Sequence, residues 1–531
     1  MANSKLENIK ALDEAREKKK KQQQKDPFSP LLPYFISNNQ IFWDKPTKEG
    51  PVAVPLANFA AKITGEEIQD DGAEKTMVFK VAGRLNNGQE LPEDEIPADK
   101  FFSMTWPTAL WGNRAIIYAG MGTKDHLRAA IQLLSGEVPR RTVYLHTGWR
   151  KIDDTWFFLH GGGAIGPGGS AERICVSLED LPGFALPSPP STEEVKEDIK
   201  RVLALLDLAP LEITVPLLAG VFRAPLGEAV SNNFSIFLAG KTGAKKSTLT
   251  AVMQSFFGAS FDYKNLPGNW ESTKNALESQ VFHAKDMLFV IDDFCPKGTQ
   301  SDVARLHREA DRLLRGAGNQ SGRRRMRPDG TLRAEYYPRA LIMTSGEDIP
   351  AGHSLRARLF ILELQQGDVD LEKLTEAQGQ AEDGVFTRVM AAYLQWLAGR
   401  MDELKEALPK RQRELRAKAR ESGILSHDRV PETVAALAIG WEKFLDFSLE
   451  IAAIDEEQKR EFFEKAWLYL TRAANKQGDY LEGEDPIKRF LSLLSAAFTS
   501  GHAHLRDHIS GQEPKEAGIF GWQRNTGYWE A

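Results

Sequence analysis

Apolar and polar residues follow different patterns in successive parts of the chain. From Pro30 to about Pro190, short runs of alternating apolar residues are separated by Gly, Asp and Pro turns, which is typical of strands. The stretch TVYLHTGWRKIDDTWFFLH predicts a β-hairpin that turns at Asp153 and Asp154. Together with a helix expected at 124–134, this pattern predicts one α+β domain with strands at 76–83, 115–119, 142–146 and 155–160.

The pattern changes after the Pro-rich segment ALPSPPSTEE, which is typical of a linker that ends in a helix start. Ser191 or Thr192 is the expected N-cap, with Glu194 in the first turn. Strand-like and helix-like runs then alternate from about 232 to 364, which predicts a parallel α/β sheet. After Asp368 we expect amphipathic helices to about residue 499.

These patterns predict four parts: a basic tail (1–27), an N-terminal α+β domain (28–190), an α/β domain (191–367) and a helical C-terminal domain (368–531). The tail carries the run KKKKQQQK, which favours a solvated segment. An arm that contacts DNA or a partner is the alternative.

The bulk composition is that of a globular protein with a buried core. The chain has 531 residues, of which 42% are hydrophobic and 27% charged, and its net charge of −6 gives no general sign of nucleic-acid binding. Its two cysteines, Cys175 and Cys295, allow neither a disulfide framework nor a four-cysteine zinc site. Because a membrane span and a signal-peptide pattern are also lacking, we expect a cytoplasmic protein without a membrane partner.

A glycine-containing loop joins an apolar strand to a helix in FSIFLAGKTGAKKSTLTAVMQSFFG. This is the context of a phosphate-binding loop, in which backbone N–H groups and a helix N-terminus surround an anion. Lys246 would contact the β- and γ-phosphates of ATP, and the Ser247 hydroxyl would bind Mg²⁺. The expected nucleotide-contacting residues are Gly240, Lys241, Thr242, Gly243, Ala244, Lys245, Lys246, Ser247 and Thr248.

One position departs from the usual form of this loop. Glycine normally precedes the lysine, because the backbone there lies close to phosphate, and this chain has Lys245 instead. We expect a somewhat weaker nucleotide affinity. For the loop taken by itself, a chance Gly-rich turn before a helix is the alternative.

A second motif, DMLFVIDDF, is an apolar strand that ends in two acids. Asp292 would bind Mg²⁺ through its water shell, and Asp293 would orient or deprotonate the attacking water. Such a strand is only moderately specific alone. After a phosphate-binding loop it predicts an ATPase that uses ATP and Mg²⁺.

Two later segments would complete the catalytic site. RALIMTSGED is an apolar strand expected between the two motif strands, and Thr344 or Ser345 would lie beside the γ-phosphate as a sensor; a plain strand end is the alternative. In SLRARLFILEL, we expect Arg358, or failing that Arg356, to stabilise the phosphoryl group across a subunit boundary. An ordinary surface arginine is the alternative.

Positive charge is concentrated between the acidic strand and the last strand. Residues 301–360 contain 12 Arg, no Lys and 7 Asp or Glu, so their net charge is 12 − 7 = +5. The segment VARLHREADRLLRG predicts a helix with one apolar face and one arginine face. In GRRRMRPDGTLRAEYYPR, the Pro-Asp-Gly turn predicts a β-hairpin, and its arginines would bind phosphates without reading bases.

The motifs GKTGAKKS, LFVIDDF and GRRRMRPDGTLR before LIMTSGE resemble the superfamily 3 and MCM-like branch of AAA+ helicases. More specifically, the chain resembles replicative helicases of plasmids and bacterial mobile elements. The resemblance implies an α/β P-loop NTPase core with an AAA+-like parallel sheet, a hexameric ring, ATP sites between subunits and a hairpin that draws single-stranded DNA through the pore. It makes Arg323, Arg324, Arg325 and Arg327 the candidate DNA contacts. Relatives often have Asn at the Thr344 position, which is a second departure after Lys245.

The favoured function is therefore a ring-forming, ATP-dependent DNA helicase or translocase that acts on single-stranded or fork DNA. We expect it to serve replication of a plasmid or mobile element, with a primase, where one is needed, encoded separately. An ATP-switched assembly or signalling protein is the main alternative, and it would not need the arginine hairpin. An origin- or promoter-binding protein and a small-molecule phosphotransferase are weaker alternatives.

Overall fold

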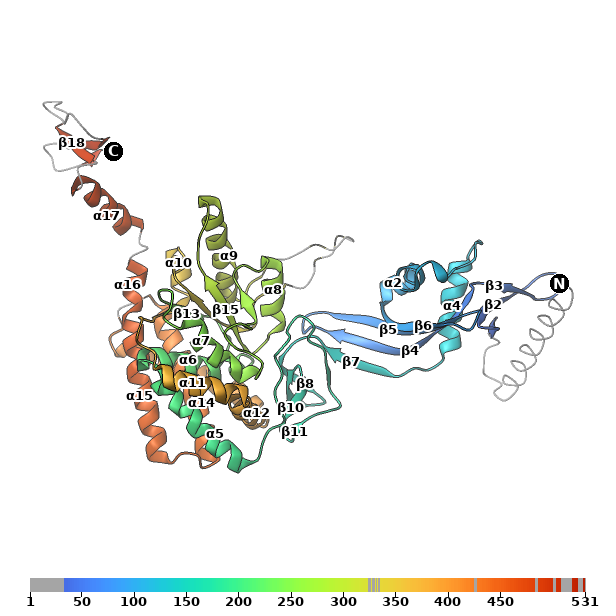
Figure 1. Ribbon diagram of the computed structural model, residues 1–531, viewed down its shortest axis with the longest axis horizontal. Helices are drawn as coiled ribbons and strands as arrows, with labels where there is room; N and C mark the ends of the chain where they lie inside the picture. Colours follow the sequence, from blue (N-terminus) through green and yellow to red (C-terminus); the bar gives the residue numbers. More distant parts are fainter. Residues whose placement is uncertain are drawn as a thin grey trace. The chain divides into compact units, whose positions relative to one another are not determined.

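The computed structural model describes residues 33–322, 326, 330, 332, 335–424, 427–482, 486–499, 503–507, 518–523 and 529–530. The chain divides into two compact units (Figure 1), one formed by residues 1–145 with 173–177 and the other by 146–172 with 178–531. The predicted N-terminal domain, 28–190, is thus shared between the units. Residues 146–172 and 178–190 belong to the second unit.

The first unit contains two sheets and three α-helices among its described residues. One sheet has the order β1-β2-β3 and the other β12-β7-β4-β5-β6. The expected helix at 124–134 is confirmed as α4, and the expected strand at 76–83 lies within β5. The elements are β1 (Tyr34–Ser37), β2 (Gln40–Lys45), β3 (Val52–Pro55), β4 (Phe59–Asp70), β5 (Lys75–Leu85), β6 (Glu90–Pro97), α2 (Ala98–Ser103), α3 (Trp106–Trp111), α4 (Thr123–Ser135), β7 (Arg140–Tyr144) and β12 (Cys175–Val176).

The strand expected at 115–119 does not form, so this prediction is wrong. Ile117 makes only an isolated bridge to Ala57. Backbone bonds at this bridge run from the Asn58 N–H to the Ile116 carbonyl and from the Tyr118 N–H to the Leu56 carbonyl (both 3.0 Å). Beside it, the Asn58 side chain donates to the Arg114 carbonyl (2.8 Å) and accepts from the Ile116 N–H (2.7 Å). The Asn58 side chain thus satisfies the Ile116 N–H, a backbone group that the alternating pattern had assigned to a sheet.

The predicted hairpin is confirmed at the start of the second unit. β8 (Gly148–Ile152) pairs antiparallel with β9 (Thr155–His160), and Ile152 lies opposite Thr155. Asp153 and Asp154 both have positive φ, 47° and 62°, as a two-residue type I′ turn requires. β10 (Gly163–Gly166) and β11 (Gly169–Ser170) extend this sheet in the order β11-β10-β9-β8.

The core of the second unit is a five-stranded parallel sheet with the order β14-β15-β16-β13-β17. Strand β16 therefore lies between the two motif strands, β13 and β15, as predicted. The strands are β13 (Ser235–Ala239), β14 (Gly268–Asn269), β15 (Leu288–Phe294), β16 (Leu341–Gly346) and β17 (Leu359–Glu363); the helices are α5 (Thr192–Ala204), α6 (Leu211–Arg223), α7 (Lys246–Gln254), α8 (Lys274–His283), α9 (Gln300–Asn319) and α10 (His353–Arg356). Ser191 caps α5 in a capping box with Glu194, which confirms the expected helix start.

The remainder of the second unit is mainly helical, as expected. Helix α14 approaches α6 closely at Gly440, where a Cβ would lie 2.5 Å from the Ala219 carbonyl oxygen. Nearby, the rings of Phe222 and Phe444 stack 3.9 Å apart. The elements are α11 (Leu371–Glu382), α12 (Val385–Ala398), α13 (Met401–Glu421), α14 (Arg429–Glu450), α15 (Glu456–Asn475), α16 (Gln477–Glu482), α17 (Pro486–Thr499), β18 (Ala503–Asp507), β19 (Gly518–Gln523) and β20 (Trp529–Glu530).

A side chain from α16 covers the edge of the parallel sheet. Gln477 is buried; its oxygen accepts from the Ile361 N–H (2.9 Å), and its amide nitrogen donates to the Ile361 carbonyl (2.8 Å). These bonds imitate a neighbouring strand on the open edge of β17. The helical region is thereby attached to a strand that borders the site described below.

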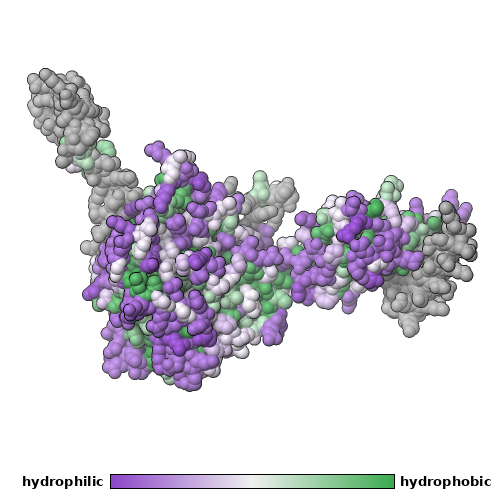
Figure 2. Space-filling view, in the orientation of Figure 1, coloured by the Kyte–Doolittle hydropathy of each residue, from purple (hydrophilic) through white to green (hydrophobic). Residues whose placement is uncertain are grey.

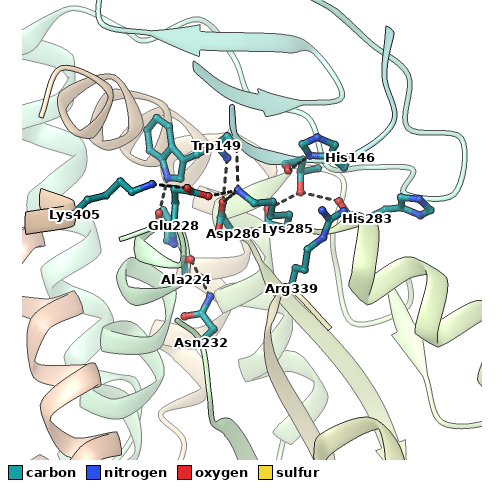
Figure 3. A network of polar contacts seen from close by, with 12 residues as sticks. His146, Trp149, Ala224, Glu228, Asn232, His283, Lys285, Asp286, Arg339 and Lys405 are labelled. Carbon is teal, nitrogen blue, oxygen red and sulfur yellow. Dashed lines mark hydrogen bonds and ion pairs between the residues drawn. The ribbon is translucent and has the colours of Figure 1, made fainter. Parts of the chain in front are cut away.

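A buried polar network attaches the hairpin to the segment that leads into β15 (Figure 3). Asp286 accepts from the Trp149 N–H (3.1 Å) and lies 2.5 Å from the Lys285 ammonium, which also pairs with Glu228 at 2.9 Å. Lys405 on α13 pairs with the other oxygen of Glu228 at 2.8 Å. Burial alone would raise the pKa of Glu228, but Lys285 and Lys405 bring it below its ordinary value. Three separate segments therefore share one set of buried and partly buried charges, and the Trp149 N–H joins the hairpin to it.

The face drawn in Figure 2 is mostly hydrophilic, and its apolar side chains form small, separate groups. Among the described residues, none of the helices has the length and apolar character needed to cross a bilayer.

Candidate nucleotide-binding site

The predicted phosphate-binding loop connects β13 to α7. Gly240 follows the last strand residue, and a Cβ at this position would overlap the carbonyl oxygen of Leu364. Gly243 has a φ of +86°, which side chains rarely adopt. The Lys246 ammonium donates to the Lys241 carbonyl across the loop (3.1 Å). Both glycines are thus required by the path of the backbone.

Lys245 occupies the position where the usual loop has glycine, and the structure shows why glycine is favoured there. Lys245 is the N-cap of α7 with φ 67° and ψ 24°, in the left-handed region. An L-residue adopts this conformation at a cost of roughly 1–2 kcal/mol. The lysine in place of glycine at position 245 therefore strains the backbone at the start of α7.

The two motifs meet at one hydrogen bond. The Ser247 hydroxyl on α7 donates to Oδ1 of Asp292 near the end of β15, at 3.0 Å. The Ser345 hydroxyl on β16 donates to the same oxygen. Two hydroxyls and one carboxylate thus converge from three adjacent elements at the carboxyl ends of the strands, where parallel α/β sheets bind ligands.

These groups suit Mg²⁺ by their chemistry. Mg²⁺ prefers oxygen ligands and usually takes only one or two from the protein, with water and substrate phosphates supplying the rest. Ser247 and Asp292 provide a hydroxyl and a carboxylate already in contact. The described residues contain no group of three or more His, Cys, Asp or Glu side chains that could hold a metal, so a Mg²⁺ ion here would depend on phosphate oxygens.

Asp293 lies in an irregular part of β15. The register with β16 shifts between Ile291 and Phe294, and Asp293 has a left-handed φ of 62°. Its side chain is exposed, while Asp292 is half-buried. A bulge with a strained residue re-aims a side chain and is common at functional sites. The bulge therefore leaves Asp292 half-buried and Asp293 exposed, although the two acids are adjacent in sequence.

Of the two hydroxyl residues predicted as sensor, Thr344 is directed away from Asp292. The Thr344 hydroxyl is buried, donates to the Ile291 carbonyl (2.6 Å) and accepts from Trp270 Nε1 (2.8 Å). The alternation of side chains along β16 brings Ser345 to Asp292 instead. Of the two alternatives, Ser345 is thus the one that contacts Asp292.

Sequence reasoning missed Glu347, which directly follows β16. Glu347 accepts from the Thr242 hydroxyl in the phosphate-binding loop and from the Cys295 thiol (3.5 Å) after β15. The bond from Thr242, followed by smaller effects, holds the Glu347 pKa below its ordinary value. A cavity of about 590 Å³ is lined by Glu347, Gly240, Lys241, His307 and Tyr480 among others. The only sign in the sequence was an acid directly after the strand.

The two candidate finger arginines lie in different places. Arg356 lines the same cavity as Gly240, and its guanidinium donates to the carbonyls of Pro350 (3.1 Å) and Tyr480 (3.0 Å). Arg358 precedes β17, and its carbonyl accepts from the N–H of Ser235 at the start of β13. Because Ser235 pairs with Leu359, Arg358 is level with Phe234. Gly240 lies six positions further along β13, so at about 3.3 Å per position the Arg358 backbone lies roughly 20 Å from its own phosphate-binding loop.

The candidate DNA contacts Arg323, Arg324, Arg325 and Arg327 lie outside the described residues. The bridge between Met326 and Leu332 is antiparallel, and Gly330 between them has a φ of +81°. These positions agree with the predicted hairpin. On the arginine face of α9, by contrast, Arg312 pairs with Glu278 (2.8 Å).

Comparison with known proteins places the fold. A family model described as a domain of unknown function (DUF927) matches residues 120–336. A structure described as "SCCmec type IV Cch - active helicase" is similar with a TM-score of 0.54 at 15% identity, over 93% of this chain and 87% of that one. The JCV helicase matches with a TM-score of 0.21 at 16% identity over 47% and 73%, and the C-terminal region of NrS-1 with 0.25 at 11% over 74% and 89%. No curated protein matches the chain.

The Cch likeness shows that this chain shares the fold of a solved helicase structure along most of its length. The mixed α/β architecture with a parallel sheet and a helical C-terminal region is therefore common to both.

Proposed function

We propose that the chain is an ATP-hydrolysing motor of the ring-forming DNA helicase kind. The observation that carries this proposal is the 3.0 Å hydrogen bond between Ser247 and Asp292. It supports a single site in which a loop that suits phosphate and a strand end that suits magnesium act on one nucleotide. The fold shared with the Cch helicase structure supports the same proposal.

Each residue has a distinct role in this proposal. Lys246 and the loop N–H groups hold the phosphates, and Ser247 with Asp292 would hold Mg²⁺, which neutralises phosphate charge when bound. Asp293 orients the attacking water and accepts its proton. Ser345 contacts Asp292 directly and reports the state of the γ-phosphate to β16.

The motor is proposed to work as a ring of identical subunits, a hexamer by the resemblance to AAA+ helicases. Arg358 lies too far from its own loop to stabilise the phosphoryl group, which supports action across a subunit boundary. The hairpin around Gly330 would carry arginines to single-stranded or fork DNA. Replication of a plasmid or mobile element in the cytoplasm, with a separate primase, remains the proposed setting.

ATP turnover measured with and without single-stranded DNA tests the proposal. Lys246→Ala is expected to abolish turnover, because Lys246 is the residue proposed to hold the β- and γ-phosphates during transfer. Lys196→Ala is the control, since this lysine pairs with Glu193 on the surface of α5 (2.8 Å). Full turnover in the Lys246→Ala protein would refute the proposed ATPase.

The alternative is an ATP-switched assembly protein that does not move along DNA. The double variant Arg324→Ala with Arg325→Ala separates the two, because a motor is expected to lose most of its stimulation by single-stranded DNA. Unchanged stimulation would favour the assembly protein.

A further inference from the structure

Glu347 is held beside the phosphate-binding loop by the backbone around it. Its N–H donates to the Phe294 carbonyl at the end of β15 (3.2 Å), and the carbonyl of the preceding Gly346 accepts from the Gly240 N–H at the start of the loop (3.2 Å). The strands approach closely here, since a Cβ at Gly346 would lie 2.6 Å from the Phe294 carbonyl oxygen. The ends of three neighbouring strands therefore determine where the Glu347 carboxylate lies.

Two segments bind the phosphate-binding loop at Thr242. The Thr242 hydroxyl donates to the Glu347 carboxylate, and the Thr242 carbonyl accepts from the side chain of Gln366 beyond β17 (2.8 Å). The Lys246 ammonium, which is proposed to hold phosphates, donates to the Lys241 carbonyl (3.1 Å). Donors that suit a phosphate are thus bonded to groups of the protein itself.

The Glu347 carboxylate also brings negative charge to this loop. The bond from Thr242 is the main cause of the low pKa of Glu347, and the charges of Lys297 and Lys246 contribute to it. The carboxyl group is therefore ionised near neutral pH. Lys297 lies 3.9 Å from the carboxylate but is itself largely exposed. A negative charge that acts on Lys246 opposes a triphosphate at the same loop, because like charges repel.

The bond between Thr242 and Glu347 excludes a bond between Thr242 and a phosphate. A hydroxyl has a single hydrogen to donate, so Thr242 cannot donate to the Glu347 carboxylate and to a phosphate oxygen at the same time. A site that is competent in only a fraction of the molecules binds its ligand more weakly by that fraction. The strength of the Glu347 contact therefore sets the apparent affinity for nucleotide.

We propose that Glu347 is an internal competitor of the nucleotide, whose carboxylate holds Thr242 until a triphosphate displaces it and returns to Thr242 as ADP leaves. This inference rests on the proposed ATPase function and adds to it a residue that controls nucleotide exchange. Product release often limits the turnover of enzymes. An acid that shortens the time for which ADP stays bound therefore speeds the cycle, at the expense of affinity.

Glu347→Gln tests the inference, because the amide keeps the size of the side chain and an acceptor for Thr242 but carries no charge. Binding of a fluorescent N-methylanthraniloyl derivative of ADP with Mg²⁺ is measured by anisotropy, and its dissociation by stopped-flow displacement with unlabelled ADP. We expect Kd to fall about tenfold, mostly through slower dissociation. With ATP as substrate, KM and kcat are both expected to fall, since ADP leaves more slowly.

Glu363→Gln is the matched control. Glu363 lines the same cavity of about 590 Å³ as Glu347, but its carboxylate accepts from Tyr480 (3.1 Å) and Gln365 (3.0 Å). This variant removes the same charge from the same cavity and leaves the bond to Thr242 in place. We expect its Kd to change less than about twofold, because solvent screens the more distant charge. An equal gain in affinity in both variants would assign the effect to the overall charge of the cavity and overturn the inference.

Other results are also decisive. Weaker ADP binding with a raised KM in Glu347→Gln would mean that the carboxylate supports the loop, and the inference would be wrong. If circular dichroism shows that this variant is unfolded, Glu347→Ala replaces it with the same expectations. A wild-type protein that binds ADP with the same Kd as the variant refutes the inference alone. Lack of nucleotide binding in both proteins refutes the ATPase proposal itself, so the two failures are distinguishable.

Discussion

Ser247 at the start of α7 and Asp292 near the end of β15 are joined by a hydrogen bond of 3.0 Å, although 45 residues separate them in the chain. Each belongs to a motif that is only moderately specific alone. Their contact joins a hydroxyl and a carboxylate at the carboxyl edge of one parallel sheet. The site therefore depends on the sheet order, which places β16 between the two motif strands.

The two neighbouring hydroxyls of β16 are expected to respond differently to mutation. Thr344→Val leaves the Trp270 indole N–H buried without its acceptor, so we expect a loss of roughly 1–3 kcal/mol in the free energy of unfolding. Ser345→Ala removes a donor to Asp292 and is expected to lower kcat with little change in stability. Thermal unfolding and steady-state turnover of both variants check this. Loss of turnover in a fully stable Thr344→Val protein would contradict it.

Relief of backbone strain at Lys245 is expected to improve the phosphate-binding loop. Lys245→Gly removes the side chain from a left-handed conformation and should raise the free energy of unfolding by about 0.5–1 kcal/mol. Lys245→Ala removes the same charge but keeps the strain, so it is the control. We expect the glycine variant to bind a fluorescent ATP analogue more tightly than the alanine variant. Equal affinity and stability in the two would show that the φ of 67° has no consequence.

Local patterns predicted well what depends on neighbouring residues. The Asp153–Asp154 turn, the Ser191 cap and the loop between β13 and α7 all follow from side chains within a few positions. The choice between Thr344 and Ser345 depended instead on pairing between β15 and β16 and on the register shift at the bulge. No short pattern contains that register.

Contacts between distant segments also lay beyond sequence reasoning. Glu347 reaches Thr242 only because β16 and β13 are neighbours. Arg429 and Arg358 reach the same Asn319 side-chain oxygen only because α14 begins beside the end of α9. The failed strand at 115–119 has a similar cause, since Asn58 is distant in sequence from the segment it satisfies. The strand propensity of a segment indicates that a strand can form there. It does not show which polar group, distant in sequence, will bond to the segment's backbone.

Close packing at Gly148 is expected to make that position intolerant of any side chain. A Cβ there would overlap the Lys285 carbonyl and lie 2.8 Å from Asp286 Oδ2, and the φ is +87°. We expect Gly148→Ala to lower the free energy of unfolding by roughly 2 kcal/mol or more. Gly367→Ala is the control, because φ is +92° there but nothing lies within 4 Å. If urea unfolding shows equal losses in the free energy of unfolding for Gly148→Ala and Gly367→Ala, backbone strain alone accounts for the effect.

Acid is expected to destabilise the second unit through His146. Burial, followed by the charge of Arg339, lowers the pKa of this histidine from 6.5 to about 3. Between these values the unfolded chain binds a proton that the folded chain does not, so stability falls as the pH decreases from 6.5 toward 3. The slope from one such group is about 1.4 kcal/mol per pH unit.

The prediction is checked by urea unfolding, followed by tryptophan fluorescence, at several pH values from 7.5 to 5. His146→Gln keeps a donor for the Thr147 carbonyl, which His146 contacts through Nδ1 at 2.7 Å, but it does not titrate. We therefore expect a shallower pH dependence in the variant below pH 6.5 and parallel curves above it. Part of the slope will remain, because burial also lowers the pKa of His160 to about 4. Identical slopes in both proteins would show that His146 is protonated equally in the folded and unfolded chains.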